Sequence, residues 1–510
     1  MTPRPSTTIP RRGARSRKVK RLLFIIMLTL GQMLAQSVSA QQQQQQRSGN
    51  GARAGTPPAA GSITGRVLAE GGQAPLGVTV FASGAGASLP SRQTGTDADG
   101  KFHLDNLAPG AYRLTVEAPG YVVVPDATRD RRRKNYYRPG DSVSISLMKG
   151  GVITGAVTYA DGQPVVAIPV SATRVRDREG RSTRDSTQGS AQRWTDDQGV
   201  YRIYGLQPGV YIVAASGGGP SYGGPLFEDD APTYYPSATR DTATEITVSG
   251  GQEIHSIDIR YRSEQGHTIS GTLSGEFLHT AGSGSLSVWL THVPSGAVEA
   301  TTYISTWERA DSSFAIRGVP DGDYYIFARS GYDERVASSF PRRVSVKGAD
   351  VTGLQLTLVP TGTITGRVVL ETTRDTERRA ECRNRLAASL EEVIVNARRD
   401  DAGTDKERLP RQFAGTRERT PDDQGNFEIV NLAAGRYRLL ASLPVDDWYV
   451  RSVTLPAVAP ARQPIDAARD GLALKPGERA QSVTITLAGG ATGLRGRVAA
   501  AMVEGSPVSL

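Results

Sequence analysis

Short runs in which hydrophobic and polar residues alternate make up most of the chain beyond about residue 62. Runs such as Tyr112–Val116 and Val143–Leu147 place every second side chain on the same face. That two-residue period is typical of a β-strand with one buried face. Gly (57 residues) and Pro (30 residues) are frequent and spread through the chain, and there is no heptad pattern. The pattern therefore predicts many short strands joined by turns.

The alternating runs belong to a unit that recurs four times. Each unit opens on an apolar-x-Gly-x-apolar strand, found at Ile63–Val67, Ile153–Val157, Ile269–Leu273 and Ile364–Val368. Each unit closes on a second alternating run, found at Val143–Leu147, Ile254–Ile259, Leu354–Leu358 and Val483–Leu487. Short strands with turns at this spacing predict antiparallel β-sandwiches.

A second motif lies inside each unit, where an Asp-x-x-Gly turn leads into a strand and then into Leu-x-Pro-Gly-x-Tyr. The first copy is Thr96–Phe102 followed by Leu107–Leu114. The second and fourth copies begin at Thr195 and Asp422, and the third copy is degraded. The Asp side chain can bond its own backbone and the Gly can adopt a positive φ, so the motif predicts a tight turn between strands.

This block resembles the carboxypeptidase regulatory-like domain, and it is similar to transthyretin-like and starch-binding-like sandwiches. The resemblance covers nearly all of residues 62–489. It implies an all-β fold of tandem immunoglobulin-like or transthyretin-like antiparallel sandwiches. In metallocarboxypeptidases such a domain accompanies the catalytic domain without a catalytic role, and nothing in this sequence resembles that catalytic domain. The resemblance is specific for fold and weak for function.

The repeats and the composition predict seven segments in the 510 residues. They are a signal peptide at 1–40, a disordered Gln/Gly/Pro linker at 41–61, sandwiches at 62–149, 150–262, 266–359 and 361–489, and the start of a fifth repeat at 490–510. The last segment either packs on the fourth sandwich or begins a shortened unit. An insertion at Arg374–Glu392 has the composition of a short helix.

The first 40 residues have the features of a secretory signal: a basic stretch, the apolar run Leu22–Leu30 and the small-x-small site Val38–Ala40. An uncleaved anchor is the alternative, but the apolar run is shorter than the roughly 20 residues that a bilayer requires. No later segment is apolar enough to span a membrane. We therefore expect an exported protein that is periplasmic, outer-membrane-associated or extracellular.

Removal of the signal changes the interpretation of the charge. The formal net charge is +9, and eight Lys and Arg residues with no acidic residue lie in positions 1–40, which leaves +9 − 8 = +1. A nearly neutral protein has little long-range attraction for phosphate backbones, so nucleic acid is not an expected partner.

Few residues are suited to catalysis or metal binding. The five histidines have no spacing typical of metal ligands, no Gly-x-Ser-x-Gly motif is present, and Cys382 is the single cysteine. The paired acidic residues of the turns provide too few oxygens for a calcium loop, so each Asp is expected to cap its own turn. The sequence predicts no enzyme, no metal site and no cofactor.

Aromatic residues are the remaining candidates for a binding site. Tyr222, Tyr234 and Tyr235 lie in the Gly- and Pro-rich segment Gly217–Pro236, and exposed tyrosine rings can stack on sugar faces. Alternatively, Tyr234 and Tyr235 begin a strand and one ring is in the core. The four tryptophans lie in or near strand patterns, and most are expected to be in cores.

These observations predict a non-enzymatic secreted or envelope binding protein whose partner is a polysaccharide or a cell-envelope protein. Carbohydrate is the leading ligand because relatives of the resembled fold bind glycans. The alternative is a structural spacer or protein–protein interaction scaffold at the envelope with no small ligand. An accessory role beside a separately encoded hydrolase comes third.

Overall fold

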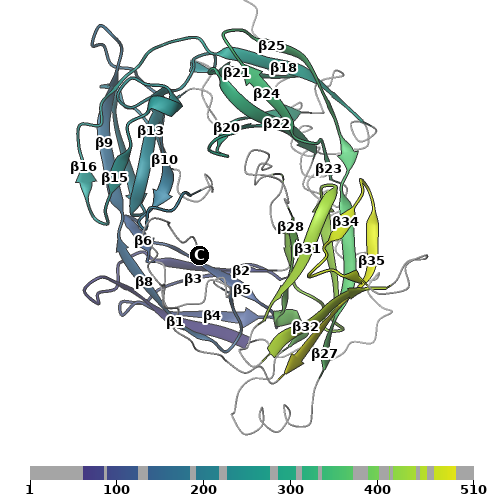
Figure 1. The fold of residues 1–510 in the computed structure, drawn as a ribbon. Coiled ribbons are helices and arrows are strands. Elements are labelled where there is room, and N and C mark those ends of the chain that lie inside the picture. Colours follow the sequence, from purple (N-terminus) through teal and green to yellow (C-terminus); the bar gives the residue numbers. More distant parts are fainter. Residues whose placement is uncertain are drawn as a thin grey trace, which may run out of the picture. The chain divides into compact units, whose positions relative to one another are not determined.

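The structure, a computed structural model, describes residues 61–85, 89–124, 136–183, 191–216, 227–275, 285–305, 313–330, 336–371, 389–400, 413, 417–443, 448–456 and 465–489. The predicted all-β fold is confirmed, because strands organised into eight sheets dominate these residues (Figure 1). The named helical elements of the described residues are two 3-10 turns, η2 (Arg240–Thr242) and η4 (Leu390–Glu392). Among the described residues, no helix is long and apolar enough to cross a bilayer.

The first two sandwiches each combine two sheets. In the first, β4 (Lys101–Leu107), β1 (Gly61–Ala69), β8 (Ser142–Lys149) and β6 (Tyr121–Val123) form one sheet, and β3 (Arg92–Gly95), β2 (Thr79–Gly84), β5 (Tyr112–Glu117) and β7 (Tyr136–Tyr137) form the other. In the second, β12 (Val200–Leu206), β9 (Gly151–Thr158) and β16 (Glu253–Ile254) form one sheet, with β17 (Ile259–Arg260) also on β9. Its other sheet has β11 (Ala191–Trp194), β10 (Pro169–Asp177), β13 (Gly209–Ala215) and β14 (Thr233–Tyr234), with β15 (Ile246–Val248) on β13.

The third and fourth sandwiches follow the same plan. The third combines β21 (Ser313–Val319), β18 (His267–Ser274) and β25 (Val351–Thr357) with the sheet of β20 (Val298–Ser305), β19 (Ser285–His292), β22 (Gly322–Ser330), β23 (Ala337–Ser338), β26 (Val359–Pro360) and β24 (Arg342–Val346). The fourth combines β30 (Asn426–Leu432), β27 (Gly362–Glu371), β35 (Arg479–Gly489), β32 (Trp448–Leu455) and β33 (Ile465–Asp466) with β29 (Arg417–Arg419), β28 (Ile394–Arg399), β31 (Gly435–Ser442) and β34 (Leu472–Leu474).

The opening strand has the same neighbours in all four sandwiches. It pairs antiparallel with the strand that follows the Asp-x-x-Gly motif, or its degraded copy in the third unit, and parallel with a closing strand. The opening strand therefore gives each sandwich a parallel pair that the alternating pattern alone does not predict. Its glycine lies opposite an aromatic residue each time: Gly65 and Phe102, Gly155 and Tyr201, Gly271 and Phe314, Gly366 and Phe427. The repeat in the sequence is therefore a repeat of strand register.

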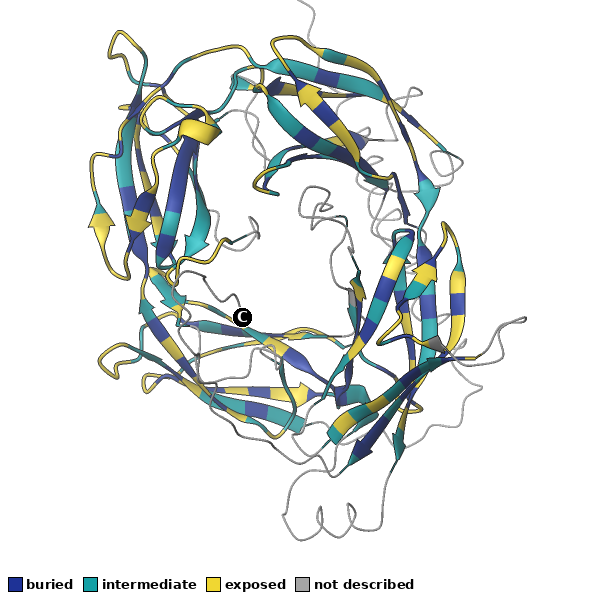
Figure 2. Cartoon of the chain, in the orientation of Figure 1, coloured by how far each residue is buried: buried dark blue, intermediate teal, exposed yellow. Residues whose placement is uncertain are grey.

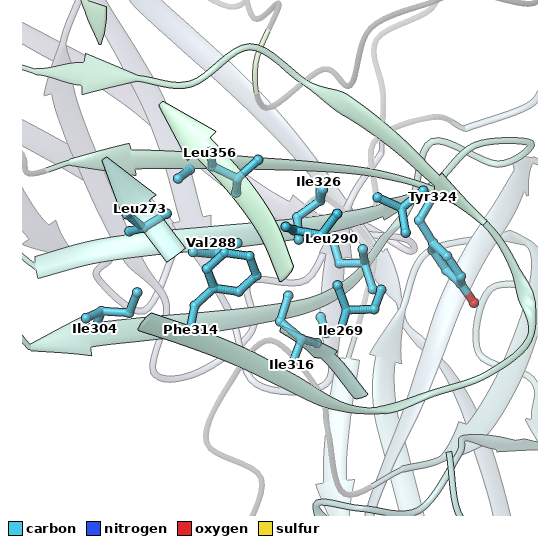
Figure 3. Close-up of a cluster of buried hydrophobic side chains, with 14 of the residues drawn as sticks. Ile269, Leu273, Val288, Leu290, Ile304, Phe314, Ile316, Tyr324, Ile326 and Leu356 are labelled. Atoms are coloured by element: carbon cyan, nitrogen blue, oxygen red, sulfur yellow. The ribbon is translucent and has the colours of Figure 1, made fainter. Parts of the chain in front are cut away.

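Each sandwich buries its own cluster of hydrophobic side chains. Buried and exposed residues alternate along strands such as β12 and β4, and the stripes on β4 are visible in Figure 2. In the third sandwich, side chains from both sheets meet in one core, where Phe314 lies among residues that include Val288 and Ile304 (Figure 3).

Several predicted features lie outside the described residues. They are the signal peptide, the Gln-rich linker up to residue 60, Cys382, the start of a fifth repeat, and the predicted helix within Arg374–Glu392 apart from Ser389 and η4.

Candidate functional site

The Asp of each complete turn motif binds the backbone of its own turn. Oδ1 of Asp97, Asp196 and Asp422 accepts hydrogen bonds from the backbone N–H groups two and four residues later, at 2.7–3.0 Å. The glycine that follows has a φ of +75° to +87° in these turns. One oxygen of each carboxylate is thus already occupied, as expected for a turn cap.

The turn is also bonded to the opening strand. The N–H of Val67, Val157 and Val368 donates to the carbonyl of the turn glycine at 2.8, 2.8 and 2.7 Å. The opening-strand motif and the Asp-x-x-Gly motif are therefore in direct contact in the fold. Among the described residues, no group of three or more His, Cys, Asp or Glu side chains is arranged to hold a metal ion.

We expect Asp196→Ala to destabilise the second sandwich by about 1–2 kcal/mol, because two backbone N–H groups lose a charged acceptor. The neighbouring Asp197 is exposed and makes no side-chain hydrogen bond with a described residue, so Asp197→Ala should change stability by less than about 0.5 kcal/mol. Hydrogen exchange of peptides covering residues 195–201 measures both variants. Equal protection in the two variants would contradict the capping role.

A buried tyrosine bonds back to the chain in all four sandwiches. The hydroxyls of Tyr112, Tyr211, Tyr324 and Tyr437 donate to the carbonyl four residues earlier, at 3.0, 2.7, 2.8 and 2.6 Å. Burial raises the pKa of Tyr211 to about 12, against a smaller opposing effect of Arg174. This arrangement is the tyrosine corner of sandwich folds, so the Tyr of the Leu-x-Pro-Gly-x-Tyr motif is structural.

The described histidines do not form a catalytic arrangement with one another. His103 is exposed on β4 beside Asp105, with 2.5 Å between Nε2 and Oδ1. His292 is buried, and burial lowers its pKa. Nδ1 of His292 lies 3.0 Å from the Ser295 hydroxyl, which satisfies one nitrogen of the ring.

Tyr234, one of the three predicted binding residues, is buried. It is 4% exposed on β14 and packs with Ile212 and Ala214 on the outer face of its sheet. The Arg240 guanidinium lies 5.2 Å from the ring centroid. Burial raises the pKa of Tyr234, and in this conformation its ring is not available to stack on a sugar.

The other two predicted residues do not complete a platform with Tyr234. Tyr235 is half-buried and packs against the core of the second sandwich. Tyr222 lies outside the described residues. The structure thus places Tyr234 and Tyr235 on packed surfaces, but Tyr234 ends the strand β14 (Thr233–Tyr234) and Tyr235 follows it, so the pair does not begin a strand as the alternative expected.

An exposed tryptophan in the same sandwich was missed by the sequence analysis. Trp194 is 47% exposed on β11. Its strand neighbour Arg193 pairs with the core residue Val170, and Trp194 pairs with Pro169. Because successive strand residues point to opposite faces, this pairing places the indole on the outer face. The sequence pattern of β11 alone does not show which face meets the core.

Trp194 lies at the end of the sheet from which the predicted Tyr-rich segment departs. The N–H of Ser216 donates to the Pro169 carbonyl at 3.1 Å, so Trp194, Pro169 and Ser216 follow one another across three neighbouring strands. Residues 217–226, which include Tyr222, continue directly from Ser216. One end of the second sandwich therefore combines an exposed indole with the start of that segment.

A second exposed aromatic residue lies on the opposite sheet of the second sandwich. Tyr204 on β12 is 44% exposed, and the Arg193 guanidinium lies 4.4 Å from its ring centroid. Arg202, two residues earlier on the same face, forms an ion pair with Glu253, with Nε–Oε1 at 3.1 Å. One face of the Tyr204 ring is thus already covered by a cation. Of these two exposed rings, Trp194 is therefore the better candidate for contact with a ligand.

Comparison with known families gives a match within the first sandwich. Residues 62–128 match the family model described as carboxypeptidase regulatory-like domain, which confirms the resemblance for this part of the chain. The second, third and fourth sandwiches share the register of its opening strand. No curated protein matches the chain in sequence.

Solved structures of bacterial proteins show similarity at low identity. The TIE protein of Bacillus anthracis is 11% identical, with 85% of this chain and 76% of that chain covered and a TM-score of 0.15. A minor pilin of Streptococcus agalactiae is 15% identical over 40% of this chain and 96% of that chain, with a TM-score of 0.19. A polysaccharide-binding candidate of Bacteroides thetaiotaomicron is 9% identical over 36% and 78%, with a TM-score of 0.18. None of these similarities identifies a function.

Proposed function

We propose that this is a non-enzymatic exported protein that binds an envelope or environmental polysaccharide through its second sandwich. The proposal starts from the carboxypeptidase regulatory-like match in the first sandwich and from three further sandwiches whose opening strands pair in the same register. The observation that carries the proposal is the exposed indole of Trp194 on a regular strand. A ring held on a strand loses little conformational entropy when it binds, and it offers a flat apolar face to the C–H face of a sugar.

Polar groups beside the indole support the choice of a sugar. Gln192 lies two residues from Trp194 on β11 and pairs with Ser171 on β10. Ser171 is on the face opposite the core, because its strand neighbours Val170 and Ala172 are fully buried, and Gln192 shares that face because it pairs with Ser171. Both side chains are partly exposed. An aromatic platform with a few hydrogen-bonding groups suits a ligand with an apolar face and hydroxyl edges.

The motifs of the repeat have structural roles in this proposal. The turn carboxylates bind backbone N–H groups, and the corner tyrosines are buried with a hydrogen bond to the backbone. The repeated residues build four scaffolds, and residues that differ between the sandwiches carry recognition.

The experiment is retention of the exported chain, residues 41–510, on a panel of insoluble and soluble polysaccharides. We expect retention on at least one glycan and a loss of about tenfold or more with Trp194→Ala, since a tenfold loss is about 1.4 kcal/mol and burial of an aromatic face contributes energy of this order. The matched control is Tyr449→Ala, which removes an aromatic residue that is 45% exposed in the fourth sandwich.

Each outcome decides between the two functions. Retention that Trp194→Ala removes and Tyr449→Ala preserves supports carbohydrate binding on the second sandwich. Retention that both variants preserve would refute this site. Absence of retention on every glycan would refute carbohydrate binding and favour the spacer or interaction scaffold.

A further inference from the structure

The third sandwich has a long strand at the edge of one of its sheets. In each sandwich a strand at the sheet edge pairs only with the second strand of the unit: β3 with β2, β11 with β10, β20 with β19 and β29 with β28. β20 (Val298–Ser305) has eight residues, whereas β3 in the first sandwich has four. The third sandwich therefore carries an edge strand twice as long as its counterpart in the first sandwich; both strands are labelled in Figure 1.

The outer side of β20 has no strand partner among the described residues. An edge strand presents a row of unpaired N–H and C=O groups, and proteins usually protect such edges with short strands, prolines, lysines or other charges. β20 contains no Pro or Lys, and residues 300–305 are uncharged. Its one charged residue, Glu299, is neutralised by Arg240 at 2.8 Å with a side chain only 5% exposed.

The side chains of β20 alternate between a face that is buried in the core and a face that is partly exposed. Ala300 and Ile304 are 7% exposed and belong to the third core, where Figure 3 shows Ile304. On the other face Tyr303 is 57% exposed. The Thr301 hydroxyl is buried and has no hydrogen-bond partner among the described residues, which is unusual for a buried polar atom.

We propose that β20 pairs antiparallel with β20 of a second copy of this chain, centred on Thr302, and that the protein is a homodimer through this edge. In this register Ala300 lies opposite Ile304 of the partner copy, and Thr301 lies opposite its Tyr303. Residues that lie opposite one another in an antiparallel pair point to the same face. The core faces of the two strands therefore lie on the same side, and the two sheets join into one continuous sheet.

The properties of β20 favour a second copy over a foreign segment. Residues 300–305 of β20 carry no charge by which to select a charged partner, whereas a second β20 matches this strand in length and in the alternation of its faces. β-branched and aromatic residues lie opposite one another in the proposed pair, which is a favourable cross-strand combination. A two-fold interface of this kind is self-complementary and closed, so it ends at two copies.

The first test is the mass of the exported chain, residues 41–510, measured by light scattering during size-exclusion chromatography. We expect twice the chain mass for the unaltered protein and the single-chain mass for Tyr303→Lys, which places a charge on the exposed face of the edge. The matched control is Gln93→Lys on β3, an exposed position on the corresponding edge of the first sandwich, and it should remain dimeric. A monomeric unaltered protein, or a dimer that Tyr303→Lys leaves intact, would overturn the proposal.

A second test locates the contact without depending on a charged variant. In a Cys382→Ser background, Thr302→Cys places one thiol on the two-fold axis of the proposed pair, so mild oxidation should link two chains. Gln93→Cys in the same background should give no linked dimer. Cross-linking by Gln93→Cys with none by Thr302→Cys would overturn pairing through β20. Neither test uses a glycan, so a negative result in either one would refute the dimer without bearing on the carbohydrate proposal.

Discussion

Replacing Tyr211 with alanine is expected to destabilise the second sandwich by about 3–5 kcal/mol, the usual cost of truncating a fully buried aromatic residue. Tyr211 is completely buried on β13 within the second core. Its hydroxyl also donates to the Gln207 carbonyl at 2.7 Å. The variant therefore loses both the packing of the ring and the bond that holds the start of the strand.

Two further variants separate these contributions. Tyr211→Phe keeps the ring and should cost about 1 kcal/mol, the net value of one hydrogen bond. Tyr204→Ala, at a position that is 44% exposed in the same sandwich, should cost much less than Tyr211→Ala. Calorimetry of the full chain with hydrogen exchange over residues 200–215 measures all three. A similar loss for Tyr204→Ala and Tyr211→Ala would contradict the structural role of the corner.

Adding one methyl group at Gly65 is expected to destabilise the first sandwich by about 3 kcal/mol, the upper end of the cost of overpacking. A Cβ at this position would lie 2.2 Å from the Val143 carbonyl oxygen and 2.6 Å from the ring of Phe102. The carbonyl belongs to the backbone of the closing strand, so relief of the clash requires the parallel β1–β8 pair to separate. The opening motif therefore requires glycine, because the Val143 carbonyl and the Phe102 ring both approach its backbone closely.

Gly95 supplies the matched control for this substitution. It lies on β3 in the same sandwich, and a Cβ there would have its nearest neighbour, the Val78 carbonyl oxygen, at 3.9 Å. Gly95→Ala should therefore be neutral or stabilising by up to about 1 kcal/mol, since it reduces the entropy of the unfolded chain. Hydrogen exchange over residues 61–69 and 142–149 in the two variants measures the difference. Equal effects would show that close packing does not explain the motif.

Sequence patterns predicted the scaffold well because its elements are local. Strand period, the Asp-x-x-Gly turn and the repeated opening strand each depend on residues close together in the chain. The turn at Asp196 illustrates this, since donor and acceptor groups lie within four residues. The repeated residues consequently mark the structural skeleton, which is why they indicate fold and give little information on binding.

The parts that sequence patterns did not predict depend on distant contacts. Whether Tyr234 is exposed depends on Arg240 and on the outer face of the sheet that includes Ile212. The exposure of Trp194 depends on which face of β11 meets the core, and that follows only from its pairing with β10. The positive φ of Asn106 and Asn431, matched by Gly205 and Gly318 at the equivalent positions, likewise emerges only when the four units are superposed in register.

The most direct test of the central claim is the affinity of residues 41–510 for soluble oligosaccharides from the polymer that retains the protein. It is measured by titration calorimetry with Trp194→Ala and Tyr449→Ala in parallel. The account predicts that Trp194→Ala weakens binding about tenfold or more, a loss of about 1.4 kcal/mol or more, while Tyr449→Ala binds like the unaltered protein. Equal affinities for all three proteins would contradict a carbohydrate site at Trp194.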